Sequence, residues 1–220
     1  MTTRLIGLAG AKRSGKNTAA KMLAELNPRL HVVERAFAAP LKIAVARLFG
    51  GEGSDEDLIA WANEFKEHGT VASSLSGWHV PHRQTGREIL QRFGTEVARQ
   101  TFGEDFWIDL TLPLNERRHV TITTAEGPQE VTFGDGNLAD RDEAGKVIDL
   151  LVVTDVRFEN EAVRVHENGG EVWQIVGGQS VSGDTHSSET PLPAEHVDVV
   201  IENHGSLADL TAQIRNQLNA

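Results

Sequence analysis

The sequence predicts an α/β fold in which helices cover both faces of a parallel five-stranded sheet. Short apolar runs that suit buried strands alternate along the chain with segments of helical periodicity. A glycine-rich turn follows the first apolar run, and α/β proteins use such a turn between a strand and a helix to bind anions. We therefore expect a three-layer sandwich whose ligands bind beyond the carboxyl ends of the strands.

Apolar runs place the five strands of this sheet. The run from Val147 to Val153 is interrupted only by Asp149, as expected of a strand that is buried on both faces. The predicted strands are the run Leu5–Leu8, followed by His31–Phe37, Val147–Val153, Val172–Val176 and Val197–Ile201.

Helix ends follow from capping residues, proline and glycine. Ser54 with Asp57, and Thr85 with Glu88, have the spacing of capping boxes. Helices are predicted at residues 19–26, 40–49, 54–68, 85–101, 159–168 and 206–218, with a loop at 70–82 and a short helix near 106. The apolar stripe of the helix at 85–101 consists of Ile89, Leu90, Phe93 and Val97.

Two segments depart from this pattern. Residues 113–146 contain two alternating runs around Gly127-Pro128, which predicts a β-hairpin insertion and an exposed loop. The polar segment at 177–194 has the character of a short lid. We expect one domain over residues 1–220 that carries both additions.

Composition limits the classes of partner. The 220 residues carry a net charge of −11, which argues against a nucleic-acid-coating surface because polyanion binders need a basic stripe. No apolar run approaches the roughly 18 residues that a membrane span requires. The absence of cysteine excludes disulfides and suits a reducing compartment, so we expect a cytoplasmic protein without nucleic-acid or membrane partners.

The turn after the first strand, GAKRSGKNT, has the GxxxxGK spacing of a phosphate-binding P-loop. Its two glycines let the backbone curl so that successive N–H groups face an anion, and three basic residues crowd the loop. The alternative is a turn that merely caps the helix. We predict that the loop binds a nucleoside triphosphate through Gly10, Ala11, Lys12, Arg13, Ser14, Gly15, Lys16, Asn17 and Thr18.

A second candidate group lies at the end of the strand LLVVT. Asp155 follows this strand directly, where P-loop enzymes place a carboxylate that holds Mg²⁺ or its waters. The alternative is an aspartate that caps the next helix. Arg157 can pair either with Asp155 or with a phosphate.

Five segments in this order resemble the bacteriophage deoxynucleoside monophosphate kinases, which are P-loop nucleoside monophosphate kinases. The resemblance covers the chain except for about residues 113–146. The segments are GAKRSGKNT, FAAPLK, TGREILQRFGTEVARQTFGEDFW, TDVRFENEA and HSSE.

The resemblance implies an ATP site at the P-loop and Mg²⁺ as cofactor. Lys16 and Arg13 would offset charge on the transferred phosphoryl group. The family commonly has an acidic residue after the P-loop lysine, but this chain has Asn17, which offers only a neutral oxygen. Asp155 is therefore the stronger metal candidate, with Asn17 as a second ligand. The lid segment lacks Lys and Arg, so Arg157 becomes a candidate for transition-state stabilisation.

The resemblance also implies that residues 38–112 bind the acceptor deoxynucleotide. Arginine's planar fork suits phosphate oxygens, and Gln91 is one helical turn beyond Arg87. The alternatives are solvated polar side chains and, for Trp107, a place in the core. The candidate acceptor residues are Lys42, Arg83, Arg87, Gln91 and Trp107.

The implied reaction is phosphoryl transfer from Mg·ATP to a deoxynucleoside monophosphate. A kinase of another small phosphate ester, such as phosphomevalonate, and a non-catalytic nucleotide-binding module are the alternatives. A regulatory GTPase is disfavoured because no NKxD-type motif occurs. The insertion at 113–146 can be a homodimer contact, a lid support or a passive loop.

Overall fold

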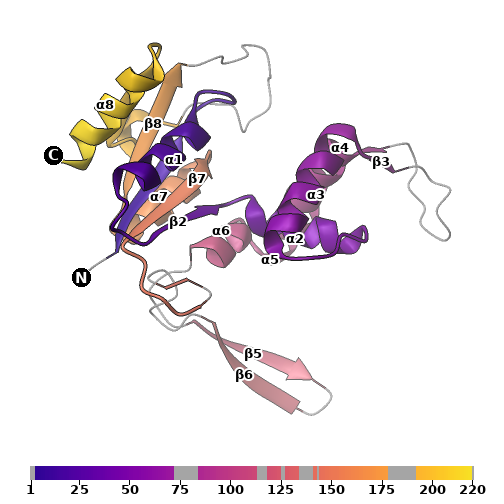
Figure 1. The fold of residues 1–220 in the computed structure, drawn as a ribbon. Coiled ribbons are helices and arrows are strands. Elements are labelled where there is room, and N and C mark those ends of the chain that lie inside the picture. Colours follow the sequence, from indigo (N-terminus) through magenta and orange to yellow (C-terminus); the bar gives the residue numbers. More distant parts are fainter. Residues whose placement is uncertain are drawn as a thin grey trace. The chain divides into compact units, whose positions relative to one another are not determined.

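A computed structural model of the protein describes residues 3–71, 84–112, 118–124, 127–133, 141–142, 144–177 and 192–219. The chain divides into two compact units, one made of Met1–Phe37 with Leu112–Ala220 and the other of Ala38–Thr111. The first unit holds the sheet and the second is mainly helical (Figure 1). Among the described helices, none has both the length and the apolar character that a membrane crossing requires.

The five predicted strands form one parallel sheet, as expected. Its strand order is β2-β7-β1-β8-β9, so the two central neighbours of the first strand come from the second half of the sequence. All four pairings are parallel. The strands are β1 (Arg4–Ala9), β2 (Val32–Ala36), β7 (Leu150–Val156), β8 (Glu171–Gly177) and β9 (Val199–Asn203).

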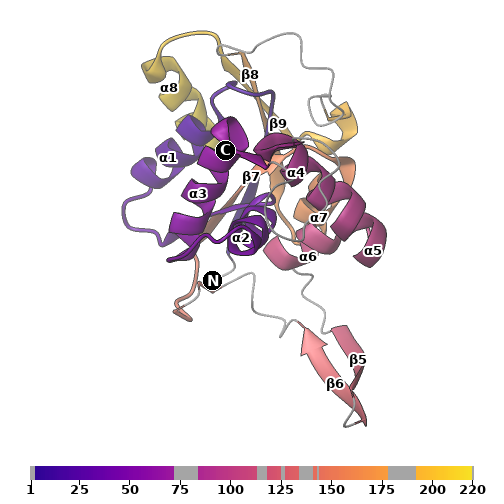
Figure 2. The ribbon, with the colours of Figure 1, turned by 90° about the vertical axis from the view of Figure 1, so that its right-hand side faces the viewer.

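Helices cover both faces of this sheet, which confirms the predicted layers. Helices α1 (Lys16–Leu26) and α8 (Leu207–Leu218) pack on one face, and α7 (Glu159–Glu167) packs on the other (Figure 2). The face below α1 and α8 carries a hydrophobic core that includes Trp173, Ile175 and Ile201. On the opposite face a Cβ at Gly7 would lie 3.0 Å from a methyl group of Val165, so α7 packs directly on the backbone of β1.

The second unit contains α2 (Ala39–Leu48), α3 (Asp55–His68), α4 (Gly86–Arg92), the π-helix η1 (Phe93–Arg99), α5 (Gln100–Phe102) and α6 (Phe106–Thr111). Both predicted capping boxes are present, since Ser54 and Thr85 each exchange hydrogen bonds with the residue three positions later. The predicted loop at 70–82 is wrong at its start, because β3 (Thr70–Val71) pairs antiparallel with β4 (Gln84–Thr85). Edge pairs of two residues leave no periodic pattern in a sequence.

The helix predicted for residues 85–101 is confirmed in its extent, since α4, η1 and α5 follow one another without a break, but its middle is the π-helix η1 rather than an α-helix. In a π-helix the hydrogen bonds join residues five apart, so the apolar stripe shifts by one position. Val97 is consequently 49% exposed, whereas Ala98, five residues after Phe93, is 2% exposed.

The predicted hairpin insertion is confirmed in its paired part. Strand β5 (Arg118–Thr124) pairs antiparallel with β6 (Gly127–Phe133). Of the predicted lid at 177–194, residues 178–191 lie outside the described residues, and the short 3₁₀-helix η3 (Ala194–His196) follows them.

Candidate active site

The glycine-rich turn between β1 and α1 has the curled backbone that the sequence predicts. Gly10, Arg13 and Gly15 have φ values of 141°, 64° and 107°. A Cβ on Gly10 would lie 2.4 Å from the carbonyl oxygen of Ile175 on β8. Both the dihedral angles and the contact therefore require glycine at position 10, and Arg13 is one of the rare non-glycine residues with positive φ.

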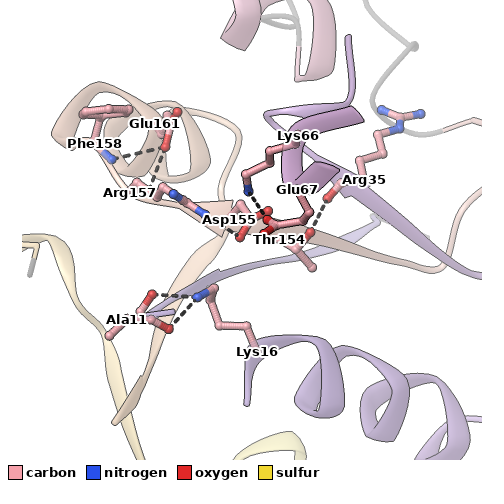
Figure 3. A network of polar contacts seen from close by, with 11 residues as sticks. Ala11, Lys16, Arg35, Lys66, Glu67, Thr154, Asp155, Arg157, Phe158 and Glu161 are labelled. Atoms are coloured by element: carbon pink, nitrogen blue, oxygen red, sulfur yellow. Dashed lines mark hydrogen bonds and ion pairs between the residues drawn. The ribbon is translucent and has the colours of Figure 1, made fainter. Parts of the chain in front are cut away.

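Lys16 lies folded onto the turn (Figure 3). Its Nζ donates to the carbonyl oxygens of Gly10 at 2.7 Å and Ala11 at 2.9 Å, and the residue is only 7% exposed. The ammonium group therefore lies against the backbone of the turn. A bound phosphate would replace the two carbonyl oxygens as the hydrogen-bond acceptor of this group. Asn17 is exposed and Thr18 is half-buried at the start of α1.

Ser14 has two contrasting polar atoms. Its carbonyl oxygen accepts a hydrogen bond of 2.8 Å from Nδ2 of Asn203, the last residue of β9. Ser14 is only 1% exposed, and its buried hydroxyl has no hydrogen-bond partner among the described residues. A buried hydroxyl without a partner carries a desolvation cost, which an anionic ligand of the turn would remove. Reasoning from the sequence missed Asn203.

Asp155 lies beside the start of the turn. In the register of β1 and β7, Ala9 pairs with Val156, and the pairing shifts between Gly7 and Ala9. Asp155 has a φ of 63°, a conformation that non-glycine residues keep mainly where the surrounding structure demands it. The strand end thus places a carboxylate next to the phosphate-binding turn.

Arg157 forms an ion pair with Asp155, with 3.4 Å between NH2 and Oδ1 (Figure 3). The α7 N-terminus is capped by Glu161 instead, since its Oε2 accepts from the N–H groups of Arg157 at 2.7 Å and Phe158 at 3.2 Å. The interpretation of Asp155 as the cap of the next helix is therefore wrong.

Glu34 on β2 is a further acidic residue that the sequence did not single out. Glu34 is exposed at the strand surface, but partial desolvation by neighbouring groups raises its pKa above the ordinary value, the negative charge of Asp155 raises the pKa further, and Lys21 lowers it. Its signal in the sequence is weak, since a single carboxylate within a predicted strand is usually solvated.

The candidate acceptor residues belong to the second unit. Arg87 on α4 pairs with Glu67 at 2.9 Å, Gln91 on the same helix is exposed, and Lys42 lies half-buried on α2. Trp107 is 5% exposed and its Nε1 donates to the carbonyl oxygen of Gly94 at 3.0 Å, so it lies in the core of this unit rather than at an open surface. Arg83 lies outside the described residues.

The residues beside the turn suit Mg²⁺ by their chemistry. Asp155 offers a carboxylate, and Asn17 and Thr18 offer neutral oxygens, which are the hard ligands that this ion prefers. Within the described ranges, no three His, Cys, Asp or Glu residues form a metal-binding group. One carboxylate still fits Mg²⁺ in kinases, since the ion takes most of its other ligands from phosphates and water.

A GxxxxGK turn between a strand and a helix of a parallel sheet, with a carboxylate beside it, defines a P-loop nucleotide-binding protein. Comparisons with known proteins agree. A family model described as deoxynucleotide monophosphate kinase matches residues 137–214. A protein of Acanthamoeba polyphaga mimivirus, provisionally named as such a kinase, is 33% identical over 96% of this chain and 93% of its own length. The chain belongs to the deoxynucleotide monophosphate kinase family.

Two phage proteins named deoxynucleotide monophosphate kinase are also similar to this chain. That of Enterobacteria phage T4 is 23% identical over 98% of both chains, and that of Escherichia phage RB69 is 29% identical over 60% of this chain and 44% of its own. An unliganded sugar kinase from Janibacter sp. HTCC2649 aligns over 99% of this chain and 95% of its own with 12% identity and a TM-score of only 0.40. Membership of the family makes the protein an enzyme that uses ATP and a nucleotide substrate.

Proposed function

We propose that this protein transfers the γ-phosphoryl group of Mg·ATP to a deoxynucleoside 5′-monophosphate, producing the diphosphate and ADP. The observation that carries the proposal is the P-loop with Asp155 beside it, in a chain related over 96% of its length to a protein named for this activity. In such transfers the protein's task is to align donor and acceptor, exclude water and offset charge.

The ATP phosphates bind at Gly10–Thr18. Backbone N–H groups at the N-terminus of α1 donate to phosphate oxygens, as does the hydroxyl of Ser14. Lys16 leaves the carbonyl groups of Gly10 and Ala11 and moves to the outer phosphates, where Arg13 adds a second positive charge. A mobile lysine suits this role because its ammonium group acts as a point charge.

Asp155 and Asn17 hold the metal ion in this proposal. When bound, Mg²⁺ neutralises charge on the phosphate oxygens. The ion pair between Asp155 and Arg157 keeps both side chains close to the P-loop. When Asp155 binds the metal ion, Arg157 leaves this carboxylate and contacts the transferred phosphoryl group. Arg157 would thereby take the role of the lid arginine that this chain lacks.

The acceptor deoxynucleotide binds in the second unit. Lys42, Arg83 and Arg87 hold its phosphate, and Gln91 contacts its base or sugar. Trp107 supports this site from the core of the unit and does not contact the base. Its ring packs edge-on against Phe106, and its indole N–H donates to the Gly94 carbonyl oxygen. No protein base is required because the second pKa of a phosphate monoester is about 6, so the attacking oxygen is already ionised at neutral pH.

A coupled ADP-release assay tests the proposal with the four deoxynucleoside monophosphates, their ribose counterparts and phosphomevalonate. We expect turnover with at least one deoxynucleotide and none with phosphomevalonate. Turnover with phosphomevalonate alone would show a kinase of another phosphate ester. Calorimetric binding of ATP without turnover or binding of any deoxynucleotide would show a non-catalytic nucleotide-binding protein.

A further inference from the structure

We infer that Asn203, at the end of β9, is a positioning residue that holds the P-loop in the shape that binds the ATP phosphates. The inference rests on the proposed function and names a residue that neither the motif nor the family resemblance indicates. Its basis is the 2.8 Å hydrogen bond from Asn203 Nδ2 to the carbonyl oxygen of Ser14, which joins residues 189 positions apart.

The hydrogen bond orients a peptide group that matters for anion binding. The carbonyl of Ser14 and the N–H of Gly15 belong to one peptide group, which is trans. In a trans peptide these two groups point to opposite sides, so holding the carbonyl toward Asn203 directs the Gly15 N–H away from β9. Gly15 is the N-cap residue of α1, where N–H groups are available to an anion.

The contact between Asn203 and the loop is close. A Cβ built on Gly15 would lie 2.4 Å from Asn203 Nδ2, so the amide occupies the space directly beside the loop backbone. On its other side, Asn203 pairs in register with Gly177, where a Cβ would lie 2.7 Å from the Asn203 carbonyl oxygen. Asn203 is half-buried and lies between the P-loop and the end of β8, so the sheet holds its bond to Ser14 in place.

The hydroxyl of Ser14 is a second, independent observation that indicates a ligand site at the loop. Its hydroxyl is buried and unpartnered among the described residues, and it lies 2.7 Å from the Cβ position of Gly10. A phosphate oxygen in the loop would accept from this hydroxyl. Asn203 thus fixes the backbone of Ser14, and so positions both the Gly15 N–H and the Ser14 hydroxyl.

Two substitutions separate donation from size. Asn203→Asp keeps the size of the side chain but presents an oxygen, with negative charge, to the Ser14 carbonyl. Asn203→Ala removes the amide. Gln213→Ala is the matched control, because Gln213 bonds the backbone of Glu202, the residue before Asn203. Its Nε2 donates to the Glu202 carbonyl oxygen at 2.8 Å and its Oε1 accepts from the Glu202 N–H at 3.1 Å. Neither of these two bonds involves the P-loop.

The test measures dissociation constants for ATP, inorganic tripolyphosphate and adenosine by calorimetry, together with kcat and KM. We expect Asn203→Ala to weaken ATP and tripolyphosphate binding about fivefold, the size of one hydrogen bond, and Asn203→Asp to weaken both further. Adenosine binding and the KM for the deoxynucleotide should stay unchanged. Gln213→Ala should change none of these constants, even where it lowers Tm.

Two results would overturn the inference. Loss of adenosine affinity with unchanged tripolyphosphate affinity would make Asn203 a base-contacting residue, and equal effects of Asn203→Asp and Gln213→Ala would make it a general structural one. If Asn203→Ala fails to fold, the isosteric Asn203→Asp decides. Failure of the wild-type protein to phosphorylate any deoxynucleotide would refute the proposed function alone, since the binding constants still test Asn203.

Discussion

Arg157 and Asp155 form an ion pair at the carboxyl end of β7, with 3.4 Å between the guanidinium NH2 and Oδ1. Both side chains are partly exposed, at 34% and 24%. The pair lies beside the first residue of the phosphate-binding turn because Ala9 and Val156 are register partners. Arg157 suits a phosphoryl group and Asp155 suits a metal ion, and in this structure the two side chains neutralise each other.

Arg157→Ala should abolish most of the turnover. An arginine that stabilises the transferred phosphoryl group contributes about 10³–10⁵ in kcat, so we expect a loss in this range with little change in Tm. Arg4→Ala is the control, since Arg4 pairs with Glu171 at the same 3.4 Å on the same sheet. Unaltered turnover of Arg157→Ala in the ADP-release assay would remove Arg157 from the mechanism.

Lys16→Ala should lower kcat by about 10²–10³, the usual effect of removing one donor to a developing charge. The side chain of Lys16 is buried, and its ammonium group donates to the Gly10 and Ala11 carbonyl oxygens. Lys21→Ala, five residues further along the same helix, should leave kcat unchanged. A variant lacking Lys16 with full activity would place the ATP site elsewhere.

Asp155→Asn should raise the Mg²⁺ concentration needed for half-maximal turnover by at least about tenfold, because the amide keeps the shape and loses the charge. Asp149→Asn is a control at the residue that directly precedes the same strand, where Asp149 Oδ2 accepts from the His31 N–H at 2.7 Å. An amide oxygen can still accept this bond. A Mg²⁺ titration of the ADP-release rate measures both, and equal curves would exclude Asp155 as a ligand.

The caps of the helices predict a pH dependence of stability. The N–H and hydroxyl of Ser206 donate to Asp209, which lowers the pKa of this carboxyl below its ordinary 3.8. A lowered folded-state pKa contributes stability above pH 3.8 that is lost as the pH falls through the lowered value. Asp209→Asn should therefore reduce Tm at pH 7, and the difference from wild type should shrink as the pH falls below 3.8.

The control for this prediction is Glu25→Gln, which alters an exposed carboxyl on α1 outside any cap. Thermal unfolding followed by circular dichroism between pH 3 and 7 distinguishes the two variants. A Tm difference for Asp209→Asn that is the same at every pH would contradict an ionic cap.

Local patterns explain what the sequence predicts well. Strand positions depend on apolar runs, helix starts on Ser54 and Thr85 with their partners three residues later, and the P-loop on the spacing of Gly10, Gly15 and Lys16. Each is specified within one short segment. The π-helix η1 is an exception, since Gly94 within it depends on residues outside the segment. Its carbonyl oxygen accepts from the Trp107 indole N–H, and Leu41 packs against its Cα.

The sequence by itself determined the α/β class, the phosphate-binding turn and the nearness of Asp155 to a strand end. Only the tertiary structure decided that Asp155 pairs with Arg157 and does not cap α7, and that its charge acts on Glu34. It also decided that Asn203 bonds the backbone of Ser14. The physical reason is the strand order. A parallel sheet brings together strand ends that are far apart in the chain, and no local pattern encodes which strands become neighbours.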